Sequence, residues 1–181
     1  MKRLLMITGF IAVGKSTFLK SLNEKMPMMS LQKDTIKEQL AEQVGFTNRA
    51  ENRALSKAAV RQMITSLPQL FLDHDLIAIE ANFTKNERSL ISEFAEHAAI
   101  KLCTVWVTCD PKIAYQRYQK RYNHLHPAHR AAPMIDEAQF ITSFSDYERA
   151  MKDDYQLKIN TSSSATFNDS AVLRFVSNRE I

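Results

Sequence analysis

The chain has 181 residues, of which 45% are hydrophobic and 24% are charged, close to the averages for globular proteins. This length suits one domain with a sizeable core, and the composition excludes a disordered or fibrous protein. The net charge of +4 suits an anionic ligand such as a phosphate ester, but it is too small to indicate a nucleic-acid partner by itself.

The two cysteines, Cys103 and Cys109, lack the C-x-x-C spacing of redox or zinc sites, so reduced thiols in the cytoplasm are the simpler interpretation. The basic and then apolar start resembles a signal peptide, but Gly9 and Lys15 interrupt the apolar run and no small-residue cleavage site follows. No other run approaches the ~20 apolar residues of a membrane span. We therefore expect a cytoplasmic protein without a membrane partner.

Apolar runs of strand length alternate with longer segments of helical period, which is typical of βαβ units in a parallel sheet covered on both faces. The sequence predicts one α/β domain over residues 1–181, with no internal repeat or linker. Its five expected strands are residues 3–8, 28–31, 76–81, 101–109 and 155–161.

Helices are expected between the strands. Residues 48–71 are rich in alanine and predict one extended helix or a bent pair. Helix starts are indicated by two acceptor residues with a partner three positions on, and by one proline suited to a first turn. These are Thr84 with Glu87, Asp136 with Gln139, and Pro111.

Residues Gly9 to Ser16 spell G-x-x-x-x-G-K-S, the phosphate-binding loop pattern, between the first expected strand and a helical segment. Glycine allows the positive φ angles and close backbone approach that direct successive amides at phosphate oxygens, and the next helix offers its positive end. We expect Lys15 to reach the β and γ phosphates and Ser16 to hold Mg²⁺ through its hydroxyl. The predicted nucleotide-binding set in this loop is Gly9, Ala12, Val13, Gly14, Lys15, Ser16 and Thr17.

Ala12 stands where many kinases carry another glycine, so the loop is expected to be slightly stiffer. The alternative to a nucleotide site is a glycine turn that only connects strand and helix. Other P-loop classes fit poorly: no glycine follows Gly45, no N-K-x-D segment exists for a GTPase, and three glycines cannot supply a transporter signature. Small phosphotransferases remain.

The loop "GFIAVGKST" is followed in order by "SLQKDTIKEQL", "IAIEANF", "VTCDPKIAYQRYQKR", "HPAHR" and "KINTS". Together these segments resemble the small P-loop kinases related to zeta toxins, chloramphenicol phosphotransferase and the kinase domain of polynucleotide kinase, over nearly the whole chain. The loop motif is highly specific, whereas the other segments gain force from their order. The resemblance implies a nucleoside-monophosphate-kinase-like sheet, an arginine-bearing lid and ATP-dependent phosphorylation of a hydroxyl.

Asp34 follows the second expected strand, where a doubly wound sheet opens its ligand crevice. A carboxylate there suits orientation of the acceptor hydroxyl and late acceptance of its proton. The alternative is an N-cap for the helix that follows. One turn further on, polynucleotide-type relatives carry an arginine, whereas this chain has Lys37, which lacks the bidentate fork and makes a nucleic-acid acceptor less secure.

Glu80 ends the third expected strand, where a carboxylate commonly completes the Mg²⁺ shell through water or assists the base. A rim carboxylate paired with a lysine is the alternative. Asn82 next to it is a weaker candidate for substrate contact. Asp34 and Glu80 are thus both candidates for the base.

Arg117 and Arg121 stand four residues apart and share one helical face, which suits a lid over the triphosphate at about residues 117–135. Arginine forks there would stabilise charge on the transferred phosphoryl group, so both are predicted to be catalytic. Arg130 follows in a loop as a nucleotide contact. A solvated helix face is the alternative for each arginine.

The remaining candidates are weaker. The resemblance places an adenine-contacting loop at residues 160–163, where Thr161 with Ser162 would supply backbone contacts, although a plain serine-rich turn fits equally well. Three lid histidines are spaced too loosely to favour a metal, and three nearby tyrosines suit packing more than base stacking. They are His124, His126 and His129, and Tyr115, Tyr118 and Tyr122.

A basic stripe recurs every fourth residue on the long helix at Arg49, Arg53, Lys57 and Arg61. Such stripes are usually solvated, but one that faced the crevice would favour a phosphate-bearing or polynucleotide acceptor. The sequence as a whole predicts a kinase that uses ATP and Mg²⁺ and acts on a hydroxyl of a small molecule. The alternatives are a polynucleotide 5′-hydroxyl kinase and an ATP-binding regulatory protein that transfers nothing.

Overall fold

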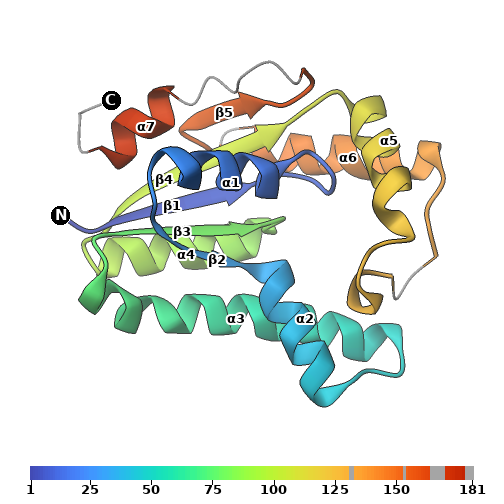
Figure 1. Cartoon of the computed structure of the whole chain (residues 1–181), viewed down its shortest axis with the longest axis horizontal. Helices are drawn as coiled ribbons and strands as arrows, with labels where there is room; N and C mark the ends of the chain where they lie inside the picture. The colour runs from blue at the N-terminus through green and yellow to red at the C-terminus, as the bar shows by residue number, and fades with distance from the viewer. Residues whose placement is uncertain (131–132, 153, 164–169, 178–181) are drawn as a thin grey trace.

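A computed structural model describes residues 1–130, 133–152, 154–163 and 170–177. Its centre is a five-stranded sheet in the order β2-β3-β1-β4-β5, and all neighbouring strands are parallel (Figure 1). The strands are β1 Arg3–Thr8, β2 Met29–Gln32, β3 Leu76–Ala81, β4 Lys101–Thr108 and β5 Leu157–Asn160. The predicted parallel sheet and its five strands are confirmed.

The largest difference in strand bounds is at β5, which was expected over residues 155–161 and is four residues long. Backbone bonds continue beyond both of its ends, from Gln156 N to Thr104 O and from Thr161 N to Thr108 O. The pairing with β4 therefore extends over nearly the predicted length, although the regular strand is shorter.

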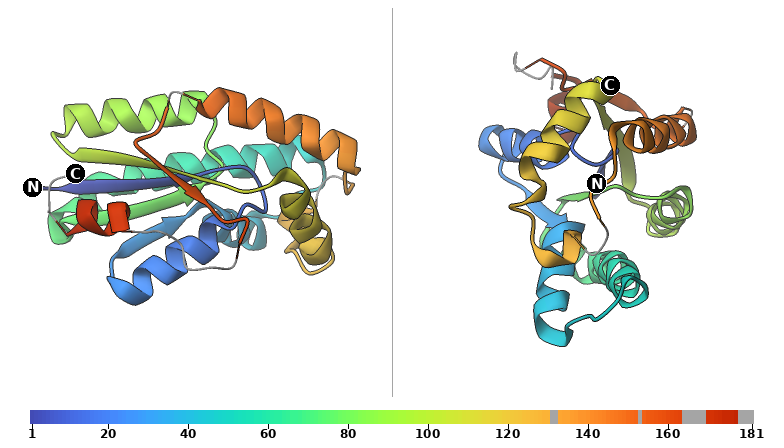
Figure 2. Two further views of the ribbon diagram at one scale, coloured as in Figure 1. Left: turned by 90° about the horizontal axis from the view of Figure 1, so that it is seen from above. Right: turned by 90° about the vertical axis from the view of Figure 1, so that its right-hand side faces the viewer.

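Helices cover both faces of the sheet (Figure 2). They are α1 Lys15–Lys25, α2 Lys33–Val44, α3 Arg49–Asp73, α4 Lys85–His97, α5 Pro111–Tyr122, α6 Glu137–Met151 and α7 Ser170–Val176, with a 3₁₀ turn, η1, at Pro127–His129. Helices α1 and α7 lie on one face, and α3, α4 and α6 lie on the other. In the described part of the chain, no helix has both the length and the apolar character needed to cross a bilayer.

The alternation of side chains along β1 separates two apolar cores. Leu5 and Ile7 belong to the core that includes α1 and α7, whereas Leu4 and Met6 belong to the core under α3 and α4. All four side chains are at most 1% exposed. β1 is thus buried on both faces, as the middle strand of a parallel sheet must be.

The predicted helix starts are present. The Thr84 side chain accepts a hydrogen bond from Glu87 N while the Glu87 side chain accepts from Thr84 N, which completes a capping box. Asp136 caps α6 by accepting from Gln139 N, and Pro111 opens α5. The long segment forms one helix, α3, which continues through Pro68.

The topology gathers the site at one edge of the sheet. The strand order reverses between β1 and β3, so the loops that follow these strands diverge to opposite sides and leave a crevice at their carboxyl ends. The glycine loop follows β1, α2 follows β2, and the segment from α5 to η1 extends over the same edge (Figure 1).

Candidate active site

A cleft of about 380 Å³ lies at the carboxyl edge of the sheet. It is lined by the loop after β1, the start of α2, one face of the first turns of α3, the end of β3, and the segment from α5 to η1. Six lysine and arginine side chains and three acidic side chains line it, so its wall is positively charged. This balance suits an anionic ligand.

The glycine loop has the backbone geometry that its sequence predicts. A Cβ atom on Gly9 would lie 2.1 Å from the Val107 carbonyl oxygen, so this position admits no side chain. Gly14 has φ of 91°, in the left-handed region. Ala12 also has a positive φ, 63°, which is uncommon for a residue with a side chain. The absence of glycine at Ala12 thus leaves the loop in its usual turn, with some strain.

Lys15 begins α1 and folds back over the glycine loop. Its Nζ atom donates a hydrogen bond of 2.9 Å to the Phe10 carbonyl oxygen. Burial lowers the pKa of Lys15, and the nearby carboxylates of Glu80 and Asp34 oppose that shift. The ammonium group is therefore held between the loop and two acidic side chains, where a polyphosphate would meet it.

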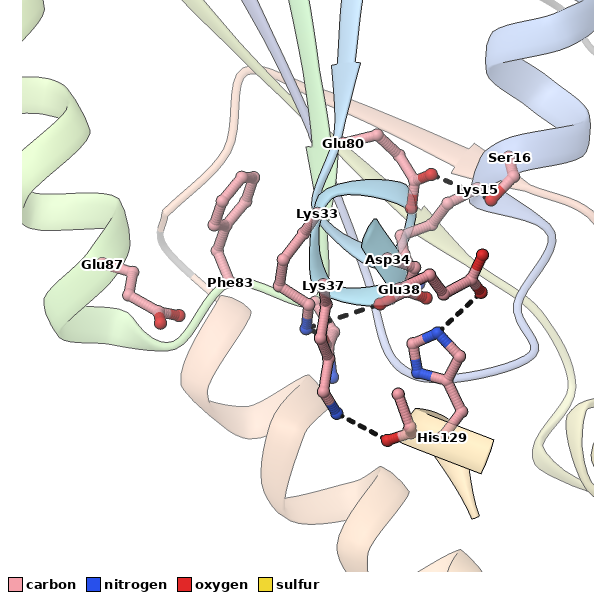
Figure 3. Close-up of polar contacts among 12 residues, drawn as sticks. Lys15, Ser16, Lys33, Asp34, Lys37, Glu38, Glu80, Phe83, Glu87 and His129 are labelled. Atoms are coloured by element: carbon pink, nitrogen blue, oxygen red, sulfur yellow. Dashed lines mark hydrogen bonds and ion pairs between the residues drawn. The ribbon is translucent and has the colours of Figure 1, made fainter. Parts of the chain in front are cut away.

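Ser16 and Glu80 form the pair expected for a magnesium site. The Ser16 hydroxyl donates to Glu80 Oε2 at 2.8 Å, although the two residues are 64 positions apart (Figure 3). Glu80 is 5% exposed, and burial raises its pKa against the opposing effects of Lys15 and Ser16. A hydroxyl beside a carboxylate is the kind of oxygen pair that Mg²⁺ prefers, so these residues fit the ion.

Asp34 lies in the first turn of α2 and lines the cleft. The N-cap of this helix is Gln32, so the alternative interpretation of Asp34 as the N-cap is wrong. Partial burial acts to raise the pKa of Asp34, whose side chain is still 65% exposed, but four surrounding basic side chains outweigh it and hold the pKa below its usual value. These are Lys33, His129, Lys15 and Lys37.

Lys33 directs its ammonium group at two partners beside the cleft. It donates to the amide oxygen of Asn82, just after β3, and lies 3.8 Å from Asp34 Oδ1. Asn82 lines the cleft, as the sequence suggested, but its oxygen is engaged by this lysine. Lys33 was not singled out from the sequence.

Three groups from distant segments form what we call the lid latch: Lys37, Asn52 and the Ala128 carbonyl. Lys37 Nζ donates to Asn52 Oδ1 at 2.9 Å and to Ala128 O at 2.8 Å, and Asn52 Nδ2 donates to the same carbonyl at 2.9 Å. Lys37 and Asn52 are at most 7% exposed. Lys37 was expected only to offer a positive charge. In the structure it joins η1, within the predicted lid, to α2 and α3.

The histidines of the predicted lid contact α2. His129 Nε2 lies 2.9 Å from Glu38 Oε1 (Figure 3), and His126 Nε2 lies 3.7 Å from Glu42 Oε1. Burial is the main cause that lowers the pKa of His129. Within the described ranges, no group of three or more histidine, cysteine or acidic side chains is placed to hold a metal ion.

The three predicted arginines have different places. Arg121 lines the cleft, and its charge interacts with Asp34 and Glu80. Arg117 does not line it: its guanidinium donates to Thr161 Oγ1 at 3.0 Å and to Thr161 O at 2.7 Å. Arg130 is exposed and also lies outside the cleft lining. Residues 131–132 of the predicted lid lie outside the described residues.

Thr161 supports the glycine loop through its side chain. It is 2% exposed and donates its hydroxyl to the Val13 carbonyl at 2.6 Å. The sequence suggested backbone contacts to adenine, and that role stays a prediction. Of the predicted loop residues, Ala12, Gly14, Lys15, Ser16 and Thr17 line the cleft, whereas Gly9 and Val13 shape the loop from behind.

Only the first two residues of the basic stripe on α3 line the cleft. Arg49 and Arg53 line the cleft together with Asn52 and Ser56, whereas Lys57 and Arg61 do not. Spacing of four residues exceeds the 3.6-residue turn, so the stripe winds away from the cleft after its first two members. Tyr115 and Tyr118 pack in the core against Phe140, and Tyr122 packs against the same core, as the packing interpretation predicts. Tyr118 also lines the cleft.

The residues missed from the sequence share one property. Lys33, Glu38, Asn52 and His129 line the cleft, but the sequence predicted no role in the cleft for any of them, and His129 was considered only as a metal ligand. The only available signal was the position of Lys33 directly after the second expected strand, beside Asp34. Lys33 is 49 positions from its partner Asn82 in the sequence, and His129 is 91 positions from its partner Glu38.

The parallel sheet, the phosphate-binding loop at its carboxyl edge and the helical segment over that edge define a P-loop protein of kinase-like fold. Residues 4–141 match the family described as AAA domain, and the chain belongs to that family. No curated protein matches the sequence. The finer resemblance to zeta toxins, chloramphenicol phosphotransferase and polynucleotide kinase stays a prediction.

Solved structures share the fold over nearly the whole chain. A candidate kinase from Chloroflexus aurantiacus is 17% identical, with a TM-score of 0.80 and 99% of each chain covered. A shikimate kinase from Bacteroides thetaiotaomicron is 14% identical, with a TM-score of 0.62 and 99% of each chain covered. An APS kinase from Mycobacterium tuberculosis, in complex with AMPPNP and APS, is 17% identical, with a TM-score of 0.58 and 97% of this chain and 96% of that one covered.

Proposed function

We propose that the protein is a kinase that transfers the γ-phosphate of ATP to a hydroxyl group of a small molecule, with Mg²⁺ bound at Ser16 and Glu80. The observation that carries this proposal is the meeting of Lys15, the Ser16–Glu80 pair and Asp34 in one cleft. A shikimate kinase and an APS kinase among the structural neighbours support it, since both have this fold. The cytoplasmic location stays a prediction.

The geometry supports the following roles. The backbone amides after Gly9 and the Lys15 ammonium group would bind the phosphates. Mg²⁺ would neutralise developing phosphate charge, and the Ser16 hydroxyl and the Glu80 carboxylate are the groups that would hold it. Asp34 stays ionised because cations hold its pKa low, so it can orient a hydroxyl rather than donate a proton.

In the transfer step, the acceptor oxygen attacks the γ-phosphorus while the bond to the β,γ-bridging oxygen breaks and ADP leaves. Asp34 accepts the hydroxyl proton late, as the oxygen–phosphorus bond forms. Arg121, which lines the same cleft, would stabilise charge on the transferred group.

The test is transfer of label from γ-labelled ATP, with Mg²⁺, to a library of hydroxy compounds that includes 5′-hydroxyl oligonucleotides. We expect acceptor-dependent ADP release by the wild-type chain, loss of ATP binding in Lys15→Ala, and retained binding with at least ~100-fold slower transfer in Asp34→Asn. Calorimetry separates binding from transfer.

Two outcomes would contradict the proposal. Tight MgATP binding without transfer to any compound would favour the regulatory alternative. Unchanged nucleotide binding in Lys15→Ala would remove the P-loop assignment itself.

A further inference from the structure

We propose that the acceptor carries an anionic group, a carboxylate or a phosphate, and that Arg49 and Arg53 of α3 bind that group inside the cleft. This inference rests on the proposed function and names the chemical class of the acceptor. Helix α3 forms one wall of the cleft. The proposed phosphate and Mg²⁺ binding uses no residue of this wall, and the inference assigns a role to it.

The two arginines share one face of α3. Residues Arg49, Asn52, Arg53 and Ser56 all line the cleft, at the spacing of a helical face. Like charges one turn apart repel each other, and an anion between two guanidinium groups removes that repulsion. The hydroxyl of Ser56 supplies a further donor on the same face.

Arg49 and Arg53 also differ from the lysines of the cleft in their partners. Within residues 1–130, 133–152, 154–163 and 170–177, neither guanidinium has a hydrogen bond or a carboxylate within 4.0 Å. The lysines are engaged: Lys15 by Phe10 O, Lys33 by Asn82, and Lys37 by the lid latch.

Glu51, the acidic residue of α3 between Arg49 and Arg53 in the sequence, binds the start of the helix and not the arginines. The Glu51 carboxylate accepts hydrogen bonds from Thr47 and Asn48 at the helix start. These bonds lower the pKa of Glu51 and fix it in the capping turn, so it does not neutralise the arginines. Two bidentate donors are therefore available to a ligand.

The size of the cleft favours a small acceptor over a polynucleotide. About 380 Å³ must hold the terminal phosphates as well as the acceptor, and small-molecule pockets start near ~300 Å³. The lid latch closes the cleft between η1 and α3, since the Ala128 carbonyl is bound by Lys37 and Asn52. A chain of nucleotides would need an open groove.

Asp34 connects this anion site to the reaction. It lies in the first turn of α2 and lines the same cleft as Arg49 and Arg53. An acceptor whose anion binds Arg49 and Arg53 could present its hydroxyl at Asp34, because all three side chains line one cleft. The pair would thus position the acceptor, with its effect on acceptor affinity rather than on ATP affinity.

The first experiment measures binding directly, by calorimetry in the presence of Mg²⁺ and a non-hydrolysable ATP analogue. The probes are glycerate and 3-phosphoglycerate, each compared with uncharged glycerol, so the carboxylate and phosphate arms are separate. We expect at least one anionic probe to bind at least 10-fold more tightly than glycerol. In Arg53→Met or Arg49→Met, its Kd should rise about 10- to 100-fold.

The matched controls are Lys57→Met and Arg61→Met, which remove charges from the same stripe outside the cleft. They should leave the Kd of the anionic probe within 2-fold. An equal loss in all four variants would indicate general charge attraction and would overturn the assignment to Arg49 and Arg53. Equal binding of glycerol and both anions would overturn it as well.

The second experiment separates this inference from the proposed function. Hydroxy acids and their neutral amides are compared as acceptors, and we expect Arg53→Met to raise the KM for the acid at least 10-fold without changing the KM for ATP. Transfer to neutral compounds or oligonucleotides in preference to acids would support a kinase but overturn the anionic acceptor. Arg53-dependent anion binding without transfer would support the anion site while contradicting the kinase proposal.

Discussion

Gly9 shows how one residue without a side chain determines the phosphate-binding loop. A Cβ atom at Gly9 would lie 2.1 Å from the Val107 carbonyl oxygen, and the backbone of β4 cannot move away without breaking its pairing with β1. We predict that Gly9→Ala lowers the free energy of unfolding by about 3 kcal/mol, because the added methyl group overpacks against backbone. Urea denaturation at constant slope would measure the loss.

Gly14→Ala is the matched control. Gly14 has φ of 91°, but the nearest atoms to its Cβ would belong to the Thr161 side chain, at 3.4 to 3.7 Å, which is ordinary contact. The left-handed backbone alone costs about 1 kcal/mol for alanine. Equal losses for the two variants would show that backbone conformation, rather than the contact with Val107, explains the requirement for glycine at Gly9.

The second prediction concerns Glu80 and the pH dependence of the free energy of unfolding. Burial raises its pKa above the usual 4.5, so the folded chain binds this proton more tightly than the unfolded chain. Stability from this group is therefore complete below the unfolded pKa and is lost as pH rises through the folded pKa. We predict that Glu80→Gln gains stability relative to wild type as pH rises from about 4.5 through that range.

The measurement is urea denaturation of both chains across that range without Mg²⁺. The glutamine can still accept the hydrogen bond from Ser16, so the comparison isolates the charge. A stability difference that is flat with pH, or that favours wild type with rising pH, would show that Glu80 is not desolvated in the folded chain.

The spacing of the sequence was enough to predict the candidate site residues that lie within one short segment. Lys15 and Ser16 were found because phosphate binding needs consecutive amides, an ammonium group and a hydroxyl within eight residues. Glu80 and Asp34 were found from their position after strands. The contacts of Lys33 with Asn82 and of His129 with Glu38 could not be predicted, since no local pattern encodes them.

Among the elements, α4 is fixed to α6 by one buried side chain. Arg88 is 2% exposed, and its guanidinium binds Phe83 O at 2.8 Å, Ala150 O at 2.9 Å and Asp154 Oδ2 at 2.5 Å. We predict that Arg88→Met costs about 3 kcal/mol, because the apolar stem is kept but two carbonyl groups lose their donor. Chemical denaturation would measure this change.

Asp154→Asn tests which bonds matter. Asp154 is 45% exposed, so its ion pair with Arg88 is partly screened by water. We expect this variant to cost about 1 kcal/mol or less. If both variants cost the same, the ion pair rather than the two carbonyl contacts would hold α4 and α6 together.

The helices and strands themselves were largely predictable, and the reason is local. Capping residues such as Thr84 and Asp136 bind backbone groups within one helical turn. Buried parallel strands are recognised in the sequence as continuous apolar runs. The packing between elements was not predictable, because Arg88 and Asp154 are 66 positions apart. The end of β5 was overestimated because its flanking residues pair with β4 outside the regular strand.

For the whole molecule, the lid latch joins parts of the chain that the sheet keeps apart. The latch connects α2, α3 and η1 across the cleft, and the sequence interval from Lys37 to Ala128 is 91 residues. Residues 117–135, which include the end of α5 and the segment after it, were predicted to act as a lid over the nucleotide. Its attachment to α2 and α3, the two helices that flank the proposed acceptor site, could not be foreseen from the spacing of the arginines.

The last prediction concerns the closure that this latch provides. Asn52→Ala removes the donor to Ala128 O and the acceptor of Lys37, while Lys37 keeps its own bond to that carbonyl. We predict a loss of about 1 kcal/mol in global stability, and at least 5-fold faster amide exchange in residues 123–130. If the protein is a kinase, acceptor-independent ATP hydrolysis should also rise several-fold relative to transfer, because a loosened lid admits water.

Asn123→Ala, an exposed position on the same segment, is the control and should leave exchange unchanged. Unchanged exchange in Asn52→Ala would mean that other contacts, such as His129 with Glu38, hold the segment closed.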